Sequence, residues 1–388
     1  MDGRKNEAAQ SPLGIYIHVP FCAGKCPYCA FYSLPELSLA DAYVKAVTEE
    51  LSSLSRLSEF TGEKAKRRAV DTVYFGGGTP SLLGGERLSA ILSAVRENFT
   101  VLPDAEITVE CNPSTPALPG LFSALNEAGV NRVSLGLQSA VDAERKKLGR
   151  RASAADAEKA VKDCIAAGIG NVSADLMLGI PGQTRESLQT SLDAVLGMGV
   201  SHISAYMLQL EEGTFFYKKR DTLSLPSEDE TAELYLFMSG YLREHGLRHY
   251  EISNFCFPGK ASRHNTRYWL GADYLGFGPS AHSFYGGKRF FLPDSLEGFL
   301  NGEKAVYDGT GGDAEETVML RLRLDEGISL KELSERFGLT PKPRFAKTVT
   351  DAEKHGLLNF DGDRLALTPA GFLISNTLIG VITDLFTY

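Results

Sequence analysis

Three cysteines lie close together near the start of the chain: Cys22, Cys26 and Cys29. The gaps, C-x3-C-x2-C, allow one short loop to present three thiolates to one face of a cubane iron–sulfur cluster. Gly24 and Pro27 favour the turns that such a loop requires. Position 31, where a further thiol would complete a longer pattern, is Phe31. The spacing therefore predicts a cluster with one iron open to another ligand.

Zinc is the alternative metal for these thiols. Structural zinc sites commonly pair their cysteines as two C-x2-C units, and this stretch contains one such unit. A zinc site here requires His18 or a distant cysteine as its fourth ligand. The remaining thiols, Cys111, Cys164 and Cys256, are interpreted as buried or unreactive, because six cysteines are too few and too unevenly placed for a disulfide scaffold.

Polar residues recur where β-rich runs of the sequence end. The run Gly76-Gly77-Gly78-Thr79-Pro80 permits close backbone approach to a ligand, with carbonyls available to an ammonium group. A plain β-turn is the alternative interpretation of these glycines. Further candidates are a carboxylate, an amide, a guanidinium and a second carboxylate: Glu110, Gln138, Arg150 and Asp175. Each alone would suit a solvated surface, but their shared position at run ends favours a common site.

The elements that would position these residues alternate between β-rich and helical patterns. The predicted strands are 15–18, 70–75, 107–110, 132–135, 172–176 and 203–207. The predicted helices are 39–58, 85–98, 118–129, 153–167, 186–199 and 228–245. This alternation predicts an α/β fold with a parallel sheet and right-handed crossovers. Six such units form a partial (β/α)6 barrel, whose chemistry belongs at the carboxyl ends of the strands.

The pattern changes after residue 250. Short strands are predicted at 280–285 and 289–292, and the stretch 307–313 is interpreted as a linker. Beyond it we expect helices at 314–323, 329–337 and 343–356, then a hairpin at 358–367 and a buried apolar helix at 372–386. These elements predict a small, mainly helical, winged-helix-like domain. The proposed divisions are a disordered 1–13, a barrel at 14–250, an extension at 251–306 and the final domain at 307–388.

Composition narrows the class of protein. Of 388 residues, 43% are hydrophobic and 23% are charged, as in ordinary globular chains, and the net charge of −9 argues against a nucleic-acid surface. The first residues lack the apolar run of a secretory signal. We therefore expect a cytoplasmic protein with no nucleic-acid partner.

The cysteine loop after the first predicted strand resembles the radical S-adenosylmethionine (SAM) superfamily. The resemblance implies a [4Fe-4S] cluster whose free iron chelates SAM and whose reduction cleaves it to a radical. The glycine run then faces the amine of SAM. Seven further residues match SAM-contacting positions of the oxygen-independent coproporphyrinogen III oxidase group: Tyr16, Tyr28, Thr79, Glu110, Gln138, Arg150 and Asp175.

That group contains an oxidase, which decarboxylates coproporphyrinogen III to protoporphyrinogen IX, and a heme chaperone. The oxidase pattern continues to a fourth cysteine, where this chain has Phe31, and carries a longer N-terminal extension. The segment His264-Asn265-Thr266-Arg267-Tyr268-Trp269 matches the H-N-x-x-Y-W motif associated with the chaperone branch. The resemblance thus favours a heme chaperone, with the oxidase as the alternative.

The chaperone interpretation assigns heme to the same motif. His264 becomes the axial iron ligand, and Tyr268 and Trp269 pack on the porphyrin; a structural histidine is the alternative, and His282 is a second candidate ligand. It also implies heme-accepting partners, among them membrane respiratory proteins, and a reductase or other electron donor. The expected chain is a monomer or homodimer that is cytoplasmic and peripheral at the membrane during delivery.

Overall fold

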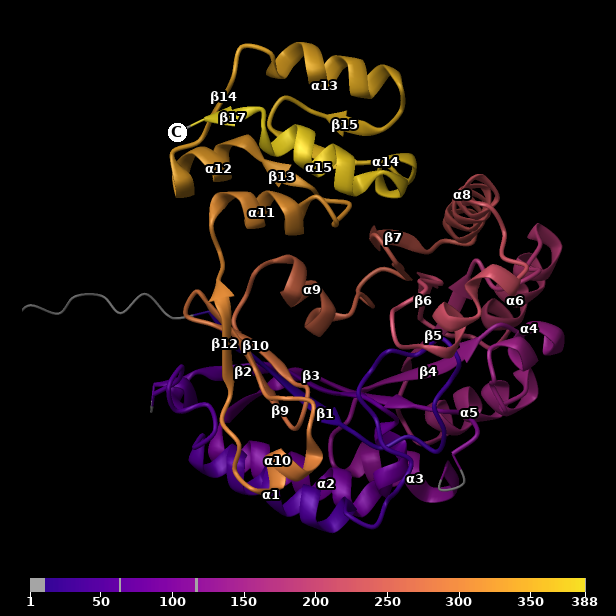
Figure 1. Cartoon of the computed structure of the whole chain (residues 1–388), viewed down its shortest axis with the longest axis vertical. Coiled ribbons are helices and arrows are strands. Elements are labelled where there is room, and N and C mark those ends of the chain that lie inside the picture. Colours follow the sequence, from indigo (N-terminus) through magenta and orange to yellow (C-terminus); the bar gives the residue numbers. More distant parts are fainter. Residues whose placement is uncertain (1–10, 63, 116–117, 388) are drawn as a thin grey trace, which may run out of the picture.

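Six parallel strands form the centre of the molecule in the computed structural model, which describes residues 11–62, 64–115 and 118–387 (Figure 1). They pair in chain order, and their carboxyl ends lie at one edge of the sheet. Their bounds are β1 (Leu13–Val19), β2 (Ala69–Gly77), β3 (Thr100–Cys111), β4 (Arg132–Gln138), β5 (Asn171–Leu178) and β6 (His202–Met207). The predicted α/β partial barrel is confirmed.

Helices connect the strands of the barrel. The expected ones are α1 (Ala40–Ser53), α2 (Gly84–Asn98), α3 (Leu118–Glu127), α5 (Ala154–Ala166), α6 (Arg185–Gly197) and α8 (Glu228–Glu244). Two short helices were not expected, α4 (Asp142–Lys147) and α7 (Phe215–Lys218). Helix α1 ends before the predicted residue 58 because Leu54 adopts a left-handed conformation with φ +52°.

Side chains of the barrel strands alternate between two environments. Ile15, Ile17 and Val19 are buried in the hydrophobic core. The residues that alternate with them along each strand face the interior of the barrel. Polar side chains of neighbouring strands meet there; for example, the Ser173 hydroxyl lies 2.7 Å from His202 Nδ1. The barrel interior is therefore polar, which is where a polar cofactor can be bound.

The sheet continues beyond the six central strands to a total of twelve within the described residues. Strand β9 (Tyr274–Phe277) runs parallel to β1 and is followed outward by β10 (His282–Tyr285), β11 (Lys288–Phe291) and β12 (Val306–Thr310), all antiparallel. At the other edge, β8 (Asn254–Cys256) and β7 (Arg248–Glu251) pair antiparallel to β6. The seven-residue helix α9 (Arg263–Trp269) lies between β8 and β9 in the chain.

The prediction of a linker at 307–313 is wrong for residues 307–310. Residues 307–310 belong to β12, which pairs with β11 at the edge of the sheet and spans the boundary proposed at residue 307. Its glycine is tolerated because Gly309, with φ +128°, lies opposite Arg289 next to a register shift. The predicted disordered segment 1–13 lies outside the described residues up to residue 10, and its last residue, Leu13, begins β1.

The C-terminal segment forms a small unit above the barrel in the view of Figure 1, with α9 between them. The expected helices are α11 (Ala314–Arg321), α12 (Leu330–Phe337) and α13 (Phe345–Lys354), and the expected hairpin is β15 (Leu358–Phe360) with β16 (Arg364–Leu367). Strand β13 (Ile328–Ser329) completes a sheet of three strands, and β14 (Thr340–Pro341) pairs with β17 (Phe386–Thr387).

The apolar segment near the end of the chain is helical, as predicted, but it is divided into α14 (Pro369–Leu373) and α15 (Ser375–Thr383). Its inward face packs into the core through Leu378, Ile379 and Ile382. A further short helix, α10 (Leu296–Leu300), precedes β12. Among the residues described, none of the helices has both the length and the apolar character needed to cross a bilayer.

Candidate functional site

The three cysteines lie on the loop that follows β1, at the carboxyl end of the barrel. The start of this loop is held by the Cys22 amide, which donates to the Leu34 carbonyl at 2.9 Å, and the Leu34 amide, which donates to the Pro20 carbonyl at 2.7 Å. A turn brings the Cys29 amide to within 3.1 Å of the Cys26 carbonyl. All three thiols are reduced and partly exposed. The loop is thus ordered by its backbone, and its sulfur atoms remain accessible.

Two hydrogen-bond donors approach these sulfur atoms. The Thr79 hydroxyl donates to Cys22 Sγ at 3.4 Å, and Arg150 Nη1 donates to Cys26 Sγ at 3.9 Å. Burial is the largest cause of the raised pKa of the Cys29 thiol in the metal-free chain, whereas coordination to a metal deprotonates a thiol. Donors directed at sulfur stabilise cluster thiolates and tune their potential. The residues of the loop therefore fit an iron–sulfur cluster.

The zinc alternative lacks its remaining ligand. His18 is buried, and its Nδ1 and Nε2 atoms are occupied by the Tyr16 hydroxyl at 3.1 Å and the Tyr32 carbonyl at 3.0 Å. In the part of the chain that the structure describes, no three His, Cys, Asp or Glu side chains converge closely enough for a single metal ion. Thiolates that bind separate irons of a cluster do not need that convergence.

The glycine-rich loop after β2 is joined to the cysteine loop by backbone hydrogen bonds. The Gly78 amide donates to the Val19 carbonyl at 2.9 Å, and the Thr79 amide donates to the Phe21 carbonyl at 2.7 Å. A Cβ at position 78 would lie 2.5 Å from the Phe21 oxygen, so only glycine fits there. The two loops form one unit, and the predicted residues Gly78 and Thr79 lie directly beside Cys22.

Two carboxyl groups, from β3 and β5 on either side of β4, face the barrel interior. Glu110 Oε1 accepts a hydrogen bond from the Tyr74 hydroxyl at 2.7 Å, and burial raises the pKa of Glu110 from 4.5 to about 7. Asp175 Oδ1 accepts from the Ser134 hydroxyl at 2.9 Å, and burial also raises the pKa of Asp175. Perturbed carboxyl groups at strand ends are typical of functional sites.

The predicted amide and guanidinium meet at the end of β4. Gln138 has φ +73°, a strained value for a residue with a side chain, and follows an irregularity in the pairing of β4 with β5. The Arg150 guanidinium donates to the Gly136 carbonyl in the same strand. Their amide and guanidinium groups flank Gly136, where an added Cβ would lie 2.8 Å from Arg150 and 3.4 Å from Gln138. The structure thus places both beside the cysteine loop, through the contact of Arg150 with Cys26.

The two predicted tyrosines lie in different parts of the molecule, one inside the barrel and one on the cysteine loop. Tyr16 faces the barrel interior, with its ring 6.2 Å from that of Tyr74. Tyr28 belongs to the cysteine loop and lies 6.4 Å from the ring of Phe216, whose amide donates to the Pro27 carbonyl at 2.9 Å. Helix α7 therefore supports the second half of the loop. Tyr28 thus lies on the cysteine loop, whereas Tyr16 lies near Glu110, since an added Cβ at Gly76 would be 3.2 Å from both side chains.

Several residues that support the site were not identified from the sequence. Tyr74 and Ser134 contact the two carboxylates, and the alternation of β2 and β4 is a signal that could have placed them inside. Arg132, also in β4, is 1% exposed, and within the described ranges its Nε and Nη1 atoms have no hydrogen-bond partner. Burial raises the pKa values of Glu110 and Asp175, and the positive charge of Arg132 offsets part of that increase.

The predicted role of His264 as a heme ligand conflicts with its position in the structure. The ring is fully buried between β2 and α9, 5.1 Å from the ring of Tyr74. Its Nδ1 lies 2.9 Å from the Thr72 hydroxyl, and its Nε2 lies 2.9 Å from the Tyr268 hydroxyl. With both nitrogens hydrogen-bonded and no exposed face, His264 corresponds to the structural alternative.

The neighbouring residues of this motif also contact protein. The Tyr268 ring lies 4.7 Å from that of Tyr274, and the Trp269 ring receives the Arg323 guanidinium at 5.7 Å, from beyond α11. The motif therefore joins α9 to the barrel interior and to the C-terminal unit. These contacts do not support the predicted packing of Tyr268 and Trp269 on a porphyrin.

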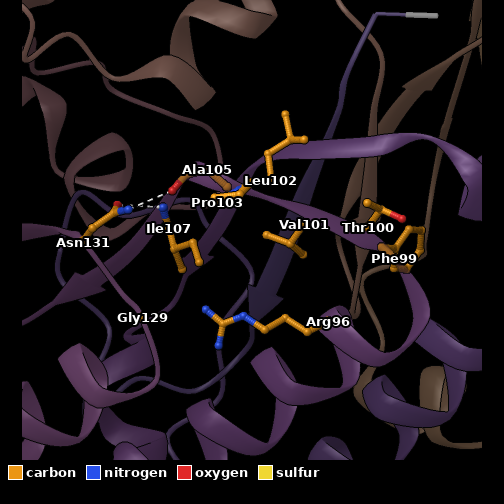
Figure 2. Close-up of a pocket in the computed structure, with 10 residues that line it drawn as sticks. All are labelled: Arg96, Phe99, Thr100, Val101, Leu102, Pro103, Ala105, Ile107, Gly129 and Asn131. Atoms are coloured by element: carbon orange, nitrogen blue, oxygen red, sulfur yellow. Dashed lines mark hydrogen bonds between the residues drawn. The ribbon is translucent and has the colours of Figure 1, made fainter.

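A cavity of about 530 Å³ lies elsewhere on the barrel, at the opposite ends of the strands (Figure 2). Its residues come from the end of α2, the first half of β3 and the segment before β4. There Asn131 bridges β3 by donating to the Ala105 carbonyl at 2.8 Å and accepting from the Ile107 amide at 2.9 Å. None of the predicted site residues lines this cavity, so it is distinct from the candidate site.

Comparison with known proteins agrees with this fold. Residues 16–195 match the model described as "Radical SAM superfamily", and residues 313–374 match "HemN C-terminal domain". The coproporphyrinogen III oxidase HemN of Escherichia coli has the same fold, with a TM-score of 0.78 at 22% identity over 97% of this chain and 91% of that one. A partial barrel with the cysteine loop after its first strand is thus a radical SAM fold.

Similarity to curated proteins narrows the class further. The heme chaperone HemW of Mycobacterium tuberculosis is 37% identical, over 95% of this chain and 94% of that protein. The heme chaperone HemW of Escherichia coli K12 is 32% identical, over 95% and 97% respectively. The chain belongs to the HemW family of the radical SAM superfamily.

Proposed function

We propose that this protein is a heme chaperone that carries a [4Fe-4S] cluster and SAM and transfers heme to acceptor proteins. The observation that carries the proposal is similarity along nearly the whole chain to proteins named heme chaperone HemW, combined with a reduced cysteine loop whose sulfur atoms are accessible. The acceptors we propose are heme proteins of the respiratory membrane, reached from the cytoplasm by a chain that is a monomer or homodimer.

Cys22, Cys26 and Cys29 would bind the cluster, which supplies an electron to SAM when it is reduced. Thr79 and Arg150 already donate to two of the sulfur atoms. We assign the amine of SAM to the Gly78 loop and Glu110, and its carboxylate to Arg150. Gln138, Asp175 and Tyr28 complete the proposed pocket by hydrogen bonding and by packing on the adenosyl part.

The oxidase is the second candidate function, because the similarity to the fold of HemN covers 97% of this chain. Two features make it the weaker candidate. Phe31 replaces the additional thiol expected of the oxidase, its side chain is 67% exposed, and its carbonyl accepts from Lys25 Nζ at 2.8 Å. Several bacterial relatives that span the chain, among them those of Mycobacterium tuberculosis and Escherichia coli, are named as heme chaperones, and the similarity to HemN at 22% identity supports the fold alone.

One experiment separates the two functions. The full chain is reconstituted anaerobically with iron and sulfide, then divided between a hemin titration and an assay with coproporphyrinogen III, SAM and a reductant. A chaperone binds heme in a defined stoichiometry, transfers it to an apo-acceptor and forms no protoporphyrinogen. Production of protoporphyrinogen IX would contradict the proposal. A variant with all three cysteines replaced by alanine should lose the iron-dependent visible absorbance, and retention of that absorbance would refute the cluster assignment.

A further inference from the structure

The histidines of the chain fall into two groups, according to whether the ring is enclosed by protein or exposed. In the first group both nitrogens are occupied by neighbouring protein atoms, and the ring is buried or half-buried: His18, His202, His249 and His264. The second group is exposed: His245, His282 and His355. Since the sequence contains seven histidines, an imidazole ligand for an iron porphyrin must come from the second group unless the barrel rearranges.

Two of the exposed histidines lie far from the candidate site. His245 and His355 each follow the end of a helix, α8 and α13, and each Nδ1 lies 2.7 Å from a carbonyl of the preceding turn. That hydrogen bond fixes the ring as part of the helix end. Neither residue lies on the barrel edge that bears the cysteine loop.

His282 is the exposed histidine beside the carboxyl end of β1. The turn that leads to it contains Gly278, which lies so close to β1 that a Cβ there would be 2.4 Å from the His18 oxygen. The turn is held by the Ser280 amide, which donates to the Leu292 carbonyl at 3.0 Å. His18 in turn contacts the Tyr32 carbonyl, which follows the cysteines in the chain. His282 is therefore fixed at the rim of the barrel, on the side of the cysteine loop.

The His282 side chain shares a sheet face with residues that face the barrel interior. Tyr16 pairs with Gly276 between β1 and β9, and Tyr274 pairs with Phe284 between β9 and β10. Because alternate residues of a strand lie on one face, His282 lies on the face of Phe284, Tyr274 and Tyr16. A molecule bound over this face would lie against the extended sheet and reach the mouth of the barrel.

Two apolar side chains, Phe291 and Val306, form an apolar strip beside the imidazole on this face. The Phe291 ring stacks on His282 with centroids 5.2 Å apart and planes at 24°. Val306, the partner of Phe291 across β11 and β12, is 45% exposed. Asp308 lies on the same strand as Val306; its Oδ2 is 4.0 Å from His282 Nδ1, and the imidazole side chain is 61% exposed. At 4.0 Å this carboxylate is beyond hydrogen-bond distance of Nδ1, and it places a negative charge on the Nδ1 side of the ring, away from Nε2.

We propose that His282 is the axial ligand of the transported heme, with Phe291 and Val306 against the porphyrin and Asp308 orienting the imidazole. This inference rests on the proposed heme chaperone function and names its binding residue. A single imidazole within an apolar strip suits an iron whose equatorial ligands come from the porphyrin, whereas a bare ion needs several protein ligands. Asp308 lies on the Nδ1 side of the imidazole, where metal-bound histidines commonly have a carboxylate that accepts from the ring, and a small side-chain movement would close the 4.0 Å separation.

The test is a hemin titration of the full, anaerobically reconstituted chain, followed by the Soret absorbance. His282→Ala should lose the Soret shift of a histidine-ligated heme and weaken hemin binding by at least about tenfold, the scale on which even outer-shell partners of metal ligands act. His355→Ala and His245→Ala are the matched controls and should match the native spectrum. Free imidazole should restore the ligated spectrum to His282→Ala.

Metal-free protoporphyrin IX separates ligation from packing. Its affinity should be the same for the native chain and His282→Ala, because it has no iron, and should fall in Val306→Asp, which places a charge in the apolar strip. Asp308→Asn should weaken hemin binding less than His282→Ala does. A folded His264→Asn variant that loses the Soret shift, while His282→Ala retains it, would overturn the assignment and leave the chaperone function intact. Absence of hemin binding by the native chain would overturn both.

Discussion

Glu110 shows how the barrel interior controls the charge of a single side chain. Burial raises its pKa to about 7, and the nearby charge of Asp175 adds to the increase. The Tyr74 hydroxyl, the Gly77 amide and the charge of Arg132 act in the opposite direction. Between pH 4.5 and 7 the folded chain therefore holds a proton at Glu110 that the unfolded chain releases, so ionisation of this carboxyl with rising pH lowers the free energy of unfolding.

A cationic ligand next to Glu110 should favour the ionised carboxylate and so offset the cost of burying its charge. If the ammonium of SAM contacts Glu110, SAM affinity should rise with pH through about 7, by up to about tenfold per pH unit below the pKa. Calorimetric titration of the reconstituted chain at roughly pH 6 and 8 measures this change. Glu110→Gln should bind SAM more weakly and flatten the pH profile in that range. An unchanged profile in Glu110→Gln would assign the titration to another group, of which Asp175 is the nearest candidate.

At the scale of elements, the cysteine loop depends on its glycine-rich neighbour. Gly78→Ala places a methyl group 2.5 Å from the Phe21 oxygen and 2.9 Å from the Val19 oxygen, both backbone atoms. The two loops must then separate, at a cost of about 1–3 kcal/mol, and we expect less iron to be retained after reconstitution. Gly24→Ala is the matched control, since nothing lies within 4 Å of its added Cβ. Equal iron content in the two variants would show that the loop contact is dispensable.

Helix α9 is anchored by a carboxylate at its start. Glu106 in β3 is 6% exposed and accepts from the Arg263 amide at 2.9 Å and the His264 amide at 3.0 Å. Glu106→Gln turns one acceptor into a donor facing an N–H, which should lower the free energy of unfolding by about 1–3 kcal/mol in denaturant titration. The control is Asp104→Asn, which affects only the exposed ion pair with Arg263, at 3.8 Å. This variant should change the free energy of unfolding by less than about 1 kcal/mol. Similar losses in both variants would contradict the anchoring role.

The elements differ in how far the sequence predicts them. The six barrel strands follow from local patterns, because buried parallel strands are short apolar runs bounded by turns. Strand β12 does not, since its residues 307–310 (YDGT) become a strand only through pairing with β11. The burial of His264 is also non-local: its ring contacts Thr72, 192 residues away. A local motif therefore suffices to predict the cysteine loop, where neighbours in sequence are neighbours in space, but does not predict the surroundings of His264, which are set by the packing of α9.

At the scale of the whole molecule, the C-terminal unit is joined to the barrel by a short backbone ladder. The Ile252 amide donates to the Arg323 carbonyl at 2.9 Å, and the Asp325 amide donates to the Tyr250 carbonyl at 3.0 Å. Beside this ladder, Arg248 donates to both oxygens of Asp325, at 2.5 and 2.7 Å. These contacts fix the segment that follows α11 along β7, and thereby hold Trp269 against Arg323.

The ladder leads to a prediction about local opening. Asp325→Asn removes one charge and half of the bidentate pair, and since Arg248 is 54% exposed the loss should be only about 1 kcal/mol. If the contact is local, amide hydrogen exchange at Ile252 and Asp325 should become about fivefold faster, while barrel amides are unchanged. Asp384→Asn is the control, because it breaks the exposed pair with Arg344 inside the C-terminal unit and should leave the Ile252 amide protected. Unaltered exchange at Ile252 in Asp325→Asn would mean that the backbone ladder alone holds the two parts together.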